Sequence, residues 1–508
     1  MVKKISQDAF EKSTNALASI FLVLGVLLYA VGNLGNRFFF SGEATFLFQF
    51  LGVGPEGQET SYLANAWSAN QSHLEPGLYT WIEHFWAQNL GTGILTLRVL
   101  PFLLFLTYVA ALLLLSRLVK APWFLGCAVV GLMFLDNFTP FYAVELSTVT
   151  AALAAAVLLP FVAIWLTVAR SFLLAVVIFV GVFTIFASFQ YNTLPIILGL
   201  AVVLIVASVR EKVRSRRTLL RIFAALSVLW LPLLYLAFAG NPLKLVGGAV
   251  LTNNPEVSQS ILLNFFSATS LPRTIFLILI PILWLLKKYP PPTRESSGSE
   301  WVINALWIAV FVSTGASFLL AAAGVNPWIL GTRGSIADVG LIALSLVGLV
   351  GLLARSTFMS GRHTRILVLL LSLVVCFAGV FRLATYERNP GFNWAPTLET
   401  MFAGRSGGTL VDPWIYPELR YWIEYSGQYD QFRGDWISHD IRVASPIDKA
   451  YPKDIQAFFD SDADRLLLRK QTVLEGIEIP SAIRVEPVNF WGDDANYPPL
   501  YPLLLIRN

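Results

Sequence analysis

Residues 146–168 read LSTVTAALAAAVLLPFVAIWLTV and contain no charged side chain. A membrane-spanning helix needs about 20 consecutive apolar residues, so this segment is long enough to cross a bilayer. The rest of the chain has a similar character, since 56% of its 508 residues are hydrophobic and only 13% are charged. Soluble domains carry roughly twice that charged fraction. The sequence therefore predicts a membrane protein rather than a soluble globule.

Apolar runs of comparable length recur along the chain, and from them we predict eleven membrane spans. The predicted spans are residues 15–33, 97–117, 121–136, 146–168, 171–189, 193–209, 222–239, 274–286, 301–322, 338–354 and 365–382. A signal peptide is the alternative for the first run, but the ten runs that follow favour an uncleaved anchor. The predicted fold class is a polytopic α-helical membrane protein.

Lysine and arginine are distributed unevenly between the two sets of predicted turns. Short loops rich in these residues stay in the cytoplasm. The turns on the same side as the N-terminus include a dense basic cluster at 210–221, whereas the opposite turns hold few basic residues. We therefore expect a multi-pass protein of the plasma or inner membrane with a cytoplasmic N-terminus. With an odd number of spans, residues 383–508 lie outside the cytoplasm.

The composition divides the chain into a membrane part, 1–382, and a more polar C-terminal part, 383–508. We predict that the second part is an extracytoplasmic α/β domain, large enough for its own core. Within it, segments 465–469 and 500–506 are expected to form strands. Segment 452–459 is expected to form a helix, because a proline stands near its start.

Three outer loops, 34–96, 240–273 and 323–337, are too long to be simple turns. Long loops between spans usually carry function or pack against another element. Within the first loop, the sequence after Pro76 predicts a helix that lies flat at the membrane surface, because apolar and aromatic residues such as Phe85 fall on one of its faces.

Three acids are expected at the outer membrane surface, namely Glu43, Glu75 and Glu145. A charge at this depth needs a partner or a function. Each acid has a simple alternative role, since Glu43 can be a solvated loop acid and the other two can cap helices. Because all three fall on one side of the membrane, we favour their convergence on one site.

Four short motifs occur in a fixed order within about the first 170 residues. They are Gly42-Glu43-Ala44, Glu75-Pro76-Gly77-Leu78-Tyr79-Thr80-Trp81, Leu97-Arg98-Val99-Leu100-Pro101 and Tyr142-Ala143-Val144-Glu145. This order resembles the membrane-embedded GT-C glycosyltransferases that use polyprenyl-phosphate sugars, particularly relatives of the bacterial aminoarabinose transferase and of the protein mannosyltransferases. That family usually has an Asp before its first Glu, where this chain has Gly42. Beyond these motifs the likeness extends only to topology.

The resemblance implies a GT-C-like fold and an inverting transfer of a sugar from polyprenyl phosphate to an acceptor hydroxyl. Such a reaction needs a base and stabilisation of the departing phosphate. Glu43 is the candidate base that the resemblance implies, and Glu75 and Glu145 are the alternatives. The implied partners are a lipid-linked sugar donor, a glycan, lipid or protein acceptor, and membrane lipids. A net charge of +4 on so long a chain gives no indication of nucleic acid binding.

The same resemblance implies a cation near the lipid phosphate. Arg333 is the candidate, and the glycines on either side of it permit close backbone approach to an anion. Its alternative role is that of an interfacial arginine that reaches lipid headgroups. Further candidates for substrate binding stand in the motifs and at the ends of the second outer loop. These are His73, Tyr79, Tyr142, Lys244 and Arg273.

The sequence leaves metal dependence open. His73 and the three acids offer ligands that suit Mg²⁺ or Mn²⁺, but no zinc-binding spacing occurs. No phosphate-binding loop, dinucleotide-binding glycine motif or G-x-S-x-G motif is present either. ATP hydrolysis, nicotinamide chemistry and α/β-hydrolase chemistry therefore have no support. Cys127 and Cys376 both stand in apolar runs, which excludes a disulfide framework and indicates small core residues.

Two other functions compete with glycosyl transfer. A transporter or flippase of a lipid-linked glycan predicts ionisable residues at the centres of the spans. Here the span centres are nearly free of charge and the acids gather at one surface, which favours surface chemistry. A non-catalytic membrane scaffold with a partner-binding outer domain is the third alternative, and it leaves the ordered acidic motifs without a role.

Overall fold

The fold is that of a computed structural model of residues 1–508. The structure describes residues 2–35, 78–136, 138–146, 148–168, 172–187, 194–210, 297–322, 335–356, 359, 361–386, 393–403, 408–411, 415–443, 458, 463–468, 479–488 and 503–507. Within the chain two compact units form. One comprises Met1–Val31, Ala66–Trp81 and Leu100–Tyr386, and the other comprises Gly32–Asn65, Ile82–Val99 and Glu387–Asn508. We call them the helical unit and the sheet unit.

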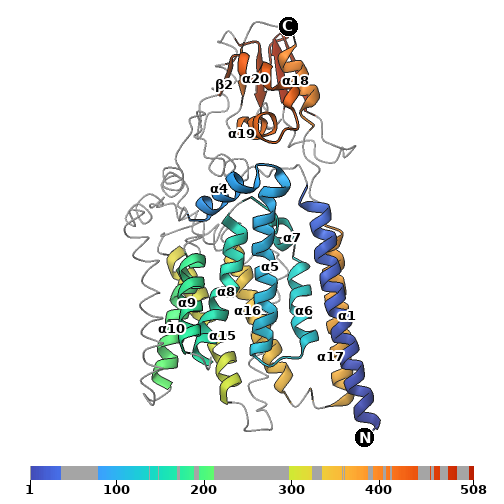
Figure 1. The fold of residues 1–508 in the computed structure, drawn as a ribbon, viewed down its shortest axis with the longest axis vertical. Coiled ribbons are helices and arrows are strands. Elements are labelled where there is room, and N and C mark those ends of the chain that lie inside the picture. Colours follow the sequence, from blue (N-terminus) through green and yellow to red (C-terminus); the bar gives the residue numbers. More distant parts are fainter. Residues whose placement is uncertain are drawn as a thin grey trace. The chain divides into compact units, whose positions relative to one another are not determined.

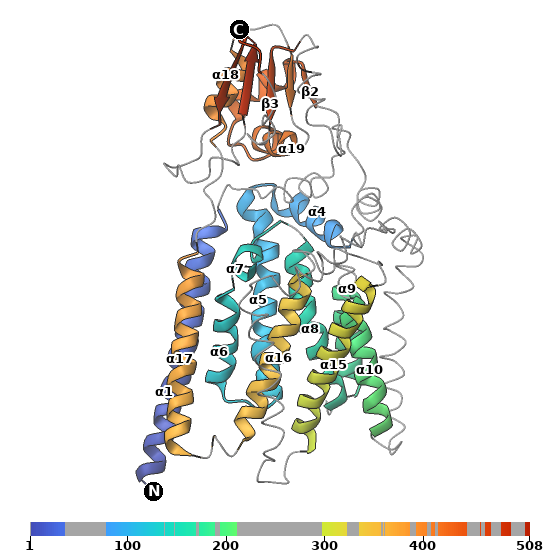
Figure 2. The ribbon, with the colours of Figure 1, turned by 180° about the vertical axis from the view of Figure 1, so that it is seen from behind.

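Helices build the helical unit (Figure 1). Those that lie in it or extend into it are α1 (Val2–Asn33), α4 (Leu78–Leu90), α5 (Ile94–Leu118), α6 (Trp123–Phe134), α7 (Phe138–Tyr142), α8 (Thr148–Val168), α9 (Phe172–Ala187), α10 (Leu194–Arg210), α15 (Ser297–Ala322), α16 (Ser335–Arg355) and α17 (Arg362–Ala384). Figure 2 shows α1 and α17 side by side, although the two helices stand far apart in the sequence.

Four of these helices are long and apolar enough to cross a membrane. They are Ala9–Asn33, Ile94–Leu118, Val149–Val168 and His363–Ala384. Five other predicted spans coincide with shorter apolar helices, namely α6, α9, α10, α15 and α16. The predicted spans 222–239 and 274–286 lie outside the described residues. The structure is thus mainly helical with four helices of spanning length, and the number eleven stays a prediction.

Burial separates the centre of the helical unit from its rim. The apolar window of α8 is 83% buried, whereas that of α1 is only 28% buried. Alanine dominates the first half of α8, and small side chains let neighbouring helices approach closely. α1 instead exposes apolar side chains such as Leu24 and Leu28. In a bilayer these side chains would meet lipid tails, so the exposed face needs no protein partner.

Helices α6 and α17 pack backbone against backbone. A Cβ atom added to Gly379 of α17 would lie 1.8 Å from the carbonyl oxygen of Gly131 in α6. The same interface contains Cys376, whose backbone lies against Gly131. Both Cys127 and Cys376 are free and fully buried, in agreement with their prediction as small core residues.

The sheet unit contains a mixed five-stranded sheet. Its strands are β1 (Thr409–Val411), β2 (Ile441–Val443), β3 (Arg465–Leu468), β4 (Ile483–Pro487) and β5 (Leu503–Arg507), in the spatial order β2-β1-β3-β5-β4. The first three strands in that order are parallel, and β5 is antiparallel to both of its neighbours. Phe458, Ala463, Leu466 and Leu505 form a core against the sheet.

Two of these strands, β3 and β5, correspond to the predicted strands 465–469 and 500–506. The other three strands were not predicted from the sequence, and the predicted helix 452–459 lies almost entirely outside the described residues. Besides the parts of α4 and α5 that belong to it, the described residues of the unit form the helices α18 (Ala395–Phe402), α19 (Tyr416–Arg420) and α20 (Arg433–Ser438), with a π-helical turn, Tyr421–Tyr425, directly after α19.

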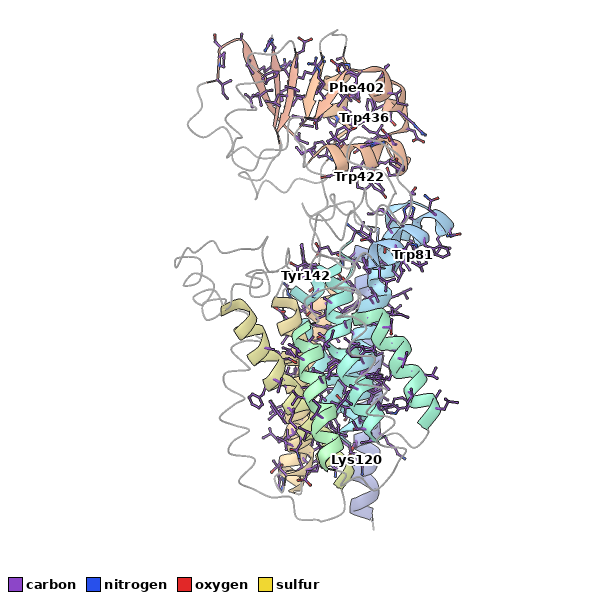
Figure 3. The ribbon with its side chains drawn as sticks, turned by 90° about the vertical axis from the view of Figure 1, so that its left-hand side faces the viewer. Trp81, Lys120, Tyr142, Phe402, Trp422 and Trp436 are labelled. Carbon is purple, nitrogen blue, oxygen red and sulfur yellow. The ribbon has the colours of Figure 1, made fainter. Side chains whose placement is uncertain are left out.

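Two tryptophans of the sheet unit, Trp394 and Trp436, are buried. Trp394 is buried and its Nε1 donates to Oε1 of Glu418 at 3.1 Å. Trp436 is also buried, stacks on Tyr416 with 5.6 Å between ring centroids, and is labelled in Figure 3. Both rings therefore contribute to the core of the unit.

Candidate functional site

Glu145 is the one predicted catalytic acid that falls within the described residues. Glu43 and Glu75 lie outside them. Four predicted substrate-binding residues, His73, Lys244, Arg273 and Arg333, also lie outside the described residues. The convergence of the three acids on one site therefore stays a prediction. What the structure does describe is the surroundings of Glu145, together with Tyr142 and Tyr79.

Glu145 belongs to the segment that joins α6 to α8. We call residues 136–146 the acidic connector, because an acid stands near each of its ends and the short helix α7 lies between them. Tyr142 of the connector and Trp81 of α4 lie at the end of the helical unit opposite Lys120 (Figure 3). Lys120 stands in a turn that the sequence assigns to the cytoplasmic side.

Both acids of the connector are buried. Glu145 is 0% exposed and Asp136 is 3% exposed. A buried carboxylate is costly unless other polar groups compensate its charge. Asp136 interacts electrostatically with the hydroxyl group of Tyr108 in α5, which is itself fully buried. Two buried acids in one short segment mark the connector as the candidate site.

Hydrogen bonds to successive carbonyls fix the path of the connector. The amide of Ala143 donates to the carbonyl of Thr139 at 3.2 Å, and the amide of Glu145 donates to the carbonyl of Tyr142 at 3.1 Å. The hydroxyl of Thr150, in the first turn of α8, also donates to the carbonyl of Tyr142. The backbone of Glu145 is therefore held by a tight turn rather than by a regular helix.

Tyr142 is largely buried, and its ring lies edge-on to that of Phe141 with 4.9 Å between centroids. Tyr142 and Glu145 thus lie in one turn. Tyr79 is also buried, on the first turn of α4. Whether either tyrosine binds substrate stays a prediction.

Helix α4 has an unusual distribution of side chains. Trp81 and Phe85 are 41% and 53% exposed, whereas Glu83 and His84 are buried. The sequence predicts this helix and its exposed aromatic face, but the buried polar face was missed. The available signal is the spacing of polar residues at positions 79, 80, 83 and 84, because residues three and four apart share a helix face.

In the sheet unit, the turn between α4 and α5 is fastened to the π-helical turn. The hydroxyl of Tyr421 donates to the carbonyl of Thr92 at 2.9 Å, and the hydroxyl of Thr92 donates to the carbonyl of Tyr425 at 3.0 Å. Gly91 permits this turn because its φ of +110° lies in the left-handed region. Burial raises the pKa of Tyr421, and the nearby Arg98 guanidinium opposes that rise.

Arg98 is itself fully buried, and its Nη1 donates to the carbonyl of Asn33 at 3.4 Å. Its position in the Leu97–Pro101 motif was noted from the sequence, but its burial was not anticipated. Asp136 was missed as well. The signal for Asp136 is its place at the end of the apolar run 121–136, where a charged residue is otherwise absent.

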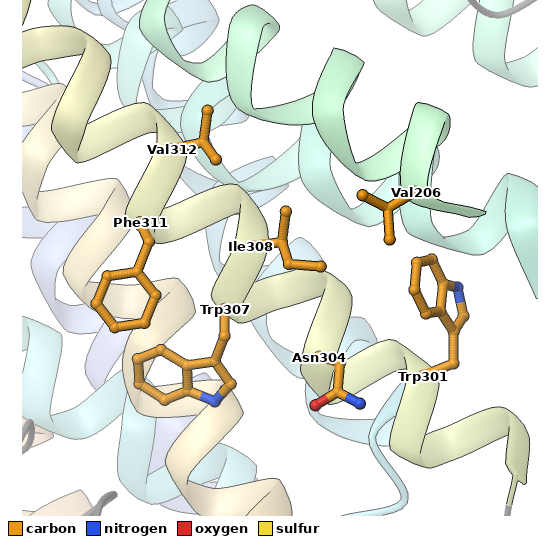
Figure 4. A pocket seen from close by; sticks show the side chains of 7 residues that line it. All are labelled: Val206, Trp301, Asn304, Trp307, Ile308, Phe311 and Val312. Atoms are coloured by element: carbon orange, nitrogen blue, oxygen red, sulfur yellow. The ribbon is translucent and has the colours of Figure 1, made fainter. Parts of the chain in front are cut away.

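A separate groove of about 570 Å³ runs along α10 and α15 (Figure 4). Trp301, Trp307 and Phe311 of α15 line it, and Val206 of α10 lies across from them. Its only polar lining side chain apart from the two indoles is Asn304. Because the groove has neither an acid nor a base among the described residues, it offers an apolar surface rather than a place for acid–base chemistry.

The described residues contain no group of three or more His, Cys, Asp or Glu side chains placed to hold a metal ion. Since His73, Glu43 and Glu75 lie outside them, the prediction of Mg²⁺ or Mn²⁺ stays untested. No protein-family model matches the chain, and a comparison with curated proteins finds no match. The function must therefore be argued from the residues of the connector.

Proposed function

We propose that this protein is a GT-C-type glycosyltransferase that moves a sugar from a polyprenyl-phosphate donor to an acceptor hydroxyl, with inversion at the sugar carbon. The observation that carries the proposal is the fully buried carboxylate of Glu145, held by the turn of the acidic connector. The proposal includes eleven spans, a cytoplasmic N-terminus, and chemistry on the extracytoplasmic side of the plasma or inner membrane.

The proposed reaction needs one base and one leaving group. A carboxylate takes the proton of the acceptor hydroxyl while the hydroxyl oxygen attacks the anomeric carbon. The bond from that carbon to the phosphate oxygen breaks, and the lipid phosphate leaves with the bonding electrons. Glu43 is our first candidate for the base, with Glu75 and Glu145 as alternatives. Arg333, Lys244 and Arg273 are the candidates that stabilise the phosphate.

Rigid placement supports a catalytic role for the connector. Catalytic groups work best when the surrounding structure fixes them close to the reactive geometry. The amide of Glu145 donates to the carbonyl of Tyr142, and the hydroxyl of Thr150 donates to that carbonyl as well. A solvated acid that only capped α8 would not need a side chain with no exposed surface.

The distribution of charge argues against the transporter. Helices α8 and α9 contain no ionisable side chain, and α6 contains only Cys127. Transporters that relay ions or protons place ionisable groups inside their spans. The charged residues of the connector instead stand at the ends of helices, as expected for chemistry at a membrane surface. The scaffold alternative gives no reason for burying two acids in one short segment.

The proposal is tested with the purified full chain in lipid nanodiscs and a panel of polyprenyl-phosphate sugars. We expect transfer of at least one sugar to a glycan, lipid or protein acceptor, with release of polyprenyl phosphate. Glu43→Gln should lower the rate by about a hundredfold or more if Glu43 is the base. Glu399→Gln, which changes an exposed acid of α18, is the matched control. Movement of the donor across vesicles without cleavage would instead establish the transporter.

A further inference from the structure

Tyr29 joins α1 to the acidic connector. Its hydroxyl donates to the carbonyl of Pro140 in α7, a residue 111 positions later in the chain. The side chain of Tyr29 is fully buried. Neighbouring rings fix its orientation, since Phe105 of α5 and Tyr386 lie 6.2 and 6.3 Å from it between centroids. The hydroxyl is therefore aimed at the connector by packing on two other segments.

This bond is one of several polar contacts along the end of α7. The carbonyls near the end of a helix lack partners within the helix. Here the carbonyl of Thr139 accepts from Ala143, that of Pro140 accepts from Tyr29, and that of Tyr142 accepts from Glu145 and Thr150. Among these donors, Tyr29 is the one that comes from a distant helix.

We propose that Tyr29 is a positioning residue for Glu145, which holds the acidic connector so that the Glu145 carboxylate keeps its place. The effect on transfer rests on the proposed function, whereas the effect on the carboxylate does not. A shift of about 1 Å in a catalytic group can lower a rate by about a hundredfold. Glu145 follows Pro140 by five residues, so a displacement of α7 also moves the turn that holds Glu145.

The kinetic test compares Tyr29→Phe with the wild-type chain. We expect kcat to fall by about ten- to a hundredfold with KM changed by less than about twofold, because positioning acts on the reacting groups rather than on donor binding. In a Glu145→Gln background, the same substitution should cause no further loss, since it acts through Glu145. An equal loss in both backgrounds would overturn the proposal.

The second test reads the carboxylate itself and needs no activity. A hydrophobic carbodiimide labels buried carboxyl groups, and mass spectrometry of the 138–147 peptide follows the time course of Glu145 labelling at one fixed pH, which we call the labelling profile. We expect Tyr29→Phe to change the rate of this labelling several-fold. Tyr421→Phe removes the same kind of bond, from a tyrosine hydroxyl to a distant carbonyl, in the sheet unit. It should leave the profile unchanged.

An identical labelling profile for Tyr29→Phe and wild type would overturn the positioning role, even if the variant melts at a lower temperature. If Tyr29→Phe does not fold, Phe105→Leu loosens the ring of Tyr29 while keeping its hydroxyl, and it should shift the profile in the same direction. An unchanged profile there also counts against the proposal. If Tyr29→Phe changes the labelling profile but the wild-type chain transfers no sugar, the positioning role of Tyr29 is supported and the proposed function is refuted.

Discussion

The acidic connector of the helical unit and the contact around Glu424 in the sheet unit are held by different kinds of bond. In the helical unit, the hydroxyls of Tyr29 and Thr150 donate to backbone carbonyls of the acidic connector. In the sheet unit, Glu424 accepts from the Arg420 guanidinium at 2.9 Å and from the indole of Trp436 at 2.8 Å. The first kind is neutral and uses the backbone, whereas the second depends on a charge. The path of the connector should therefore respond to packing, and the Glu424 contact to salt.

The largest effect is expected where backbones touch in the helical unit. Gly379→Val places a side chain against the carbonyl of Gly131, at a position where even a Cβ atom would lie 1.8 Å away. We expect α6 and α17 to separate and the yield of folded protein to fall severely. Gly181→Val is the matched control, because nothing lies within 4 Å of a Cβ atom there. Size-exclusion profiles in detergent measure both, and equal yields would contradict the close packing.

In the sheet unit, the largest expected effect is the loss of a core ring. Trp394→Ala removes a buried indole and its bond to Glu418, and we expect a loss of about 3–5 kcal/mol. Hydrogen exchange of peptides from α18 and α19 reports the change within the full chain, because Trp394 caps the first and bonds to Glu418 of the second. Unchanged protection of those helices would show that Trp394 does not stabilise them.

A smaller effect is expected for the charged contact. Glu424→Gln keeps the shape of the side chain but removes the charge that Arg420 meets, and both side chains are only partly exposed, 10% for Arg420 and 19% for Glu424. Because solvent still screens this pair, we expect a loss of about 0.5–1 kcal/mol that shrinks in high salt. A loss of stability that does not depend on salt would mean that packing of the side chains, rather than their charge, stabilises this contact.

The smallest effect concerns pH. Burial first, and then Arg465, lower the pKa of His439, against the opposing carboxylates of Asp440, Asp435 and Asp464. The unfolded chain then binds more protons than the folded one. The contribution of neutral His439 to the stability of the sheet unit is therefore complete above the usual histidine pKa of about 6.5. It is lost as the pH falls through that value toward the lower pKa of the folded state.

His439→Gln should remove this pH dependence of stability from the sheet unit. The pH dependence of the stability of the helical unit should stay unchanged. Hydrogen exchange of β1 and β2 between pH 5 and pH 7.5, corrected for the intrinsic rate, measures the difference. A pH dependence that persists in His439→Gln would assign it to other groups.

The sequence is informative about the helical unit because its elements are local. Each apolar run that falls within the described residues is one helix, so α5, α8 and α17 follow directly from the length and charge of their segments. In the sheet unit, β1 and β2 have only three residues each and are paired through partners far away in the sequence. Such short strands carry little periodic pattern, which is why they were not predicted.

The same difference explains what was found and missed at the site. Glu145 stands out because an acid next to a long apolar run is conspicuous in the sequence. The role of Tyr29 depends on contact between residues 111 positions apart, which no local pattern encodes. Glu83 and His84 were missed because their helix was interpreted from its aromatic face alone, although their burial shows that its polar face points inward.

The buried carboxylate of Glu145 is the observation on which the proposed sugar transfer rests. Its role is tested by the initial rate of transfer by Glu145→Gln, with Glu399→Gln as the control and with equal folding of both verified by melting temperature. We expect a rate lower by about a hundredfold or more for Glu145→Gln, whether Glu145 is the base or places the acceptor for Glu43, and an unchanged rate for the control. A Glu145→Gln variant that transfers the sugar as fast as the wild-type chain would contradict this role.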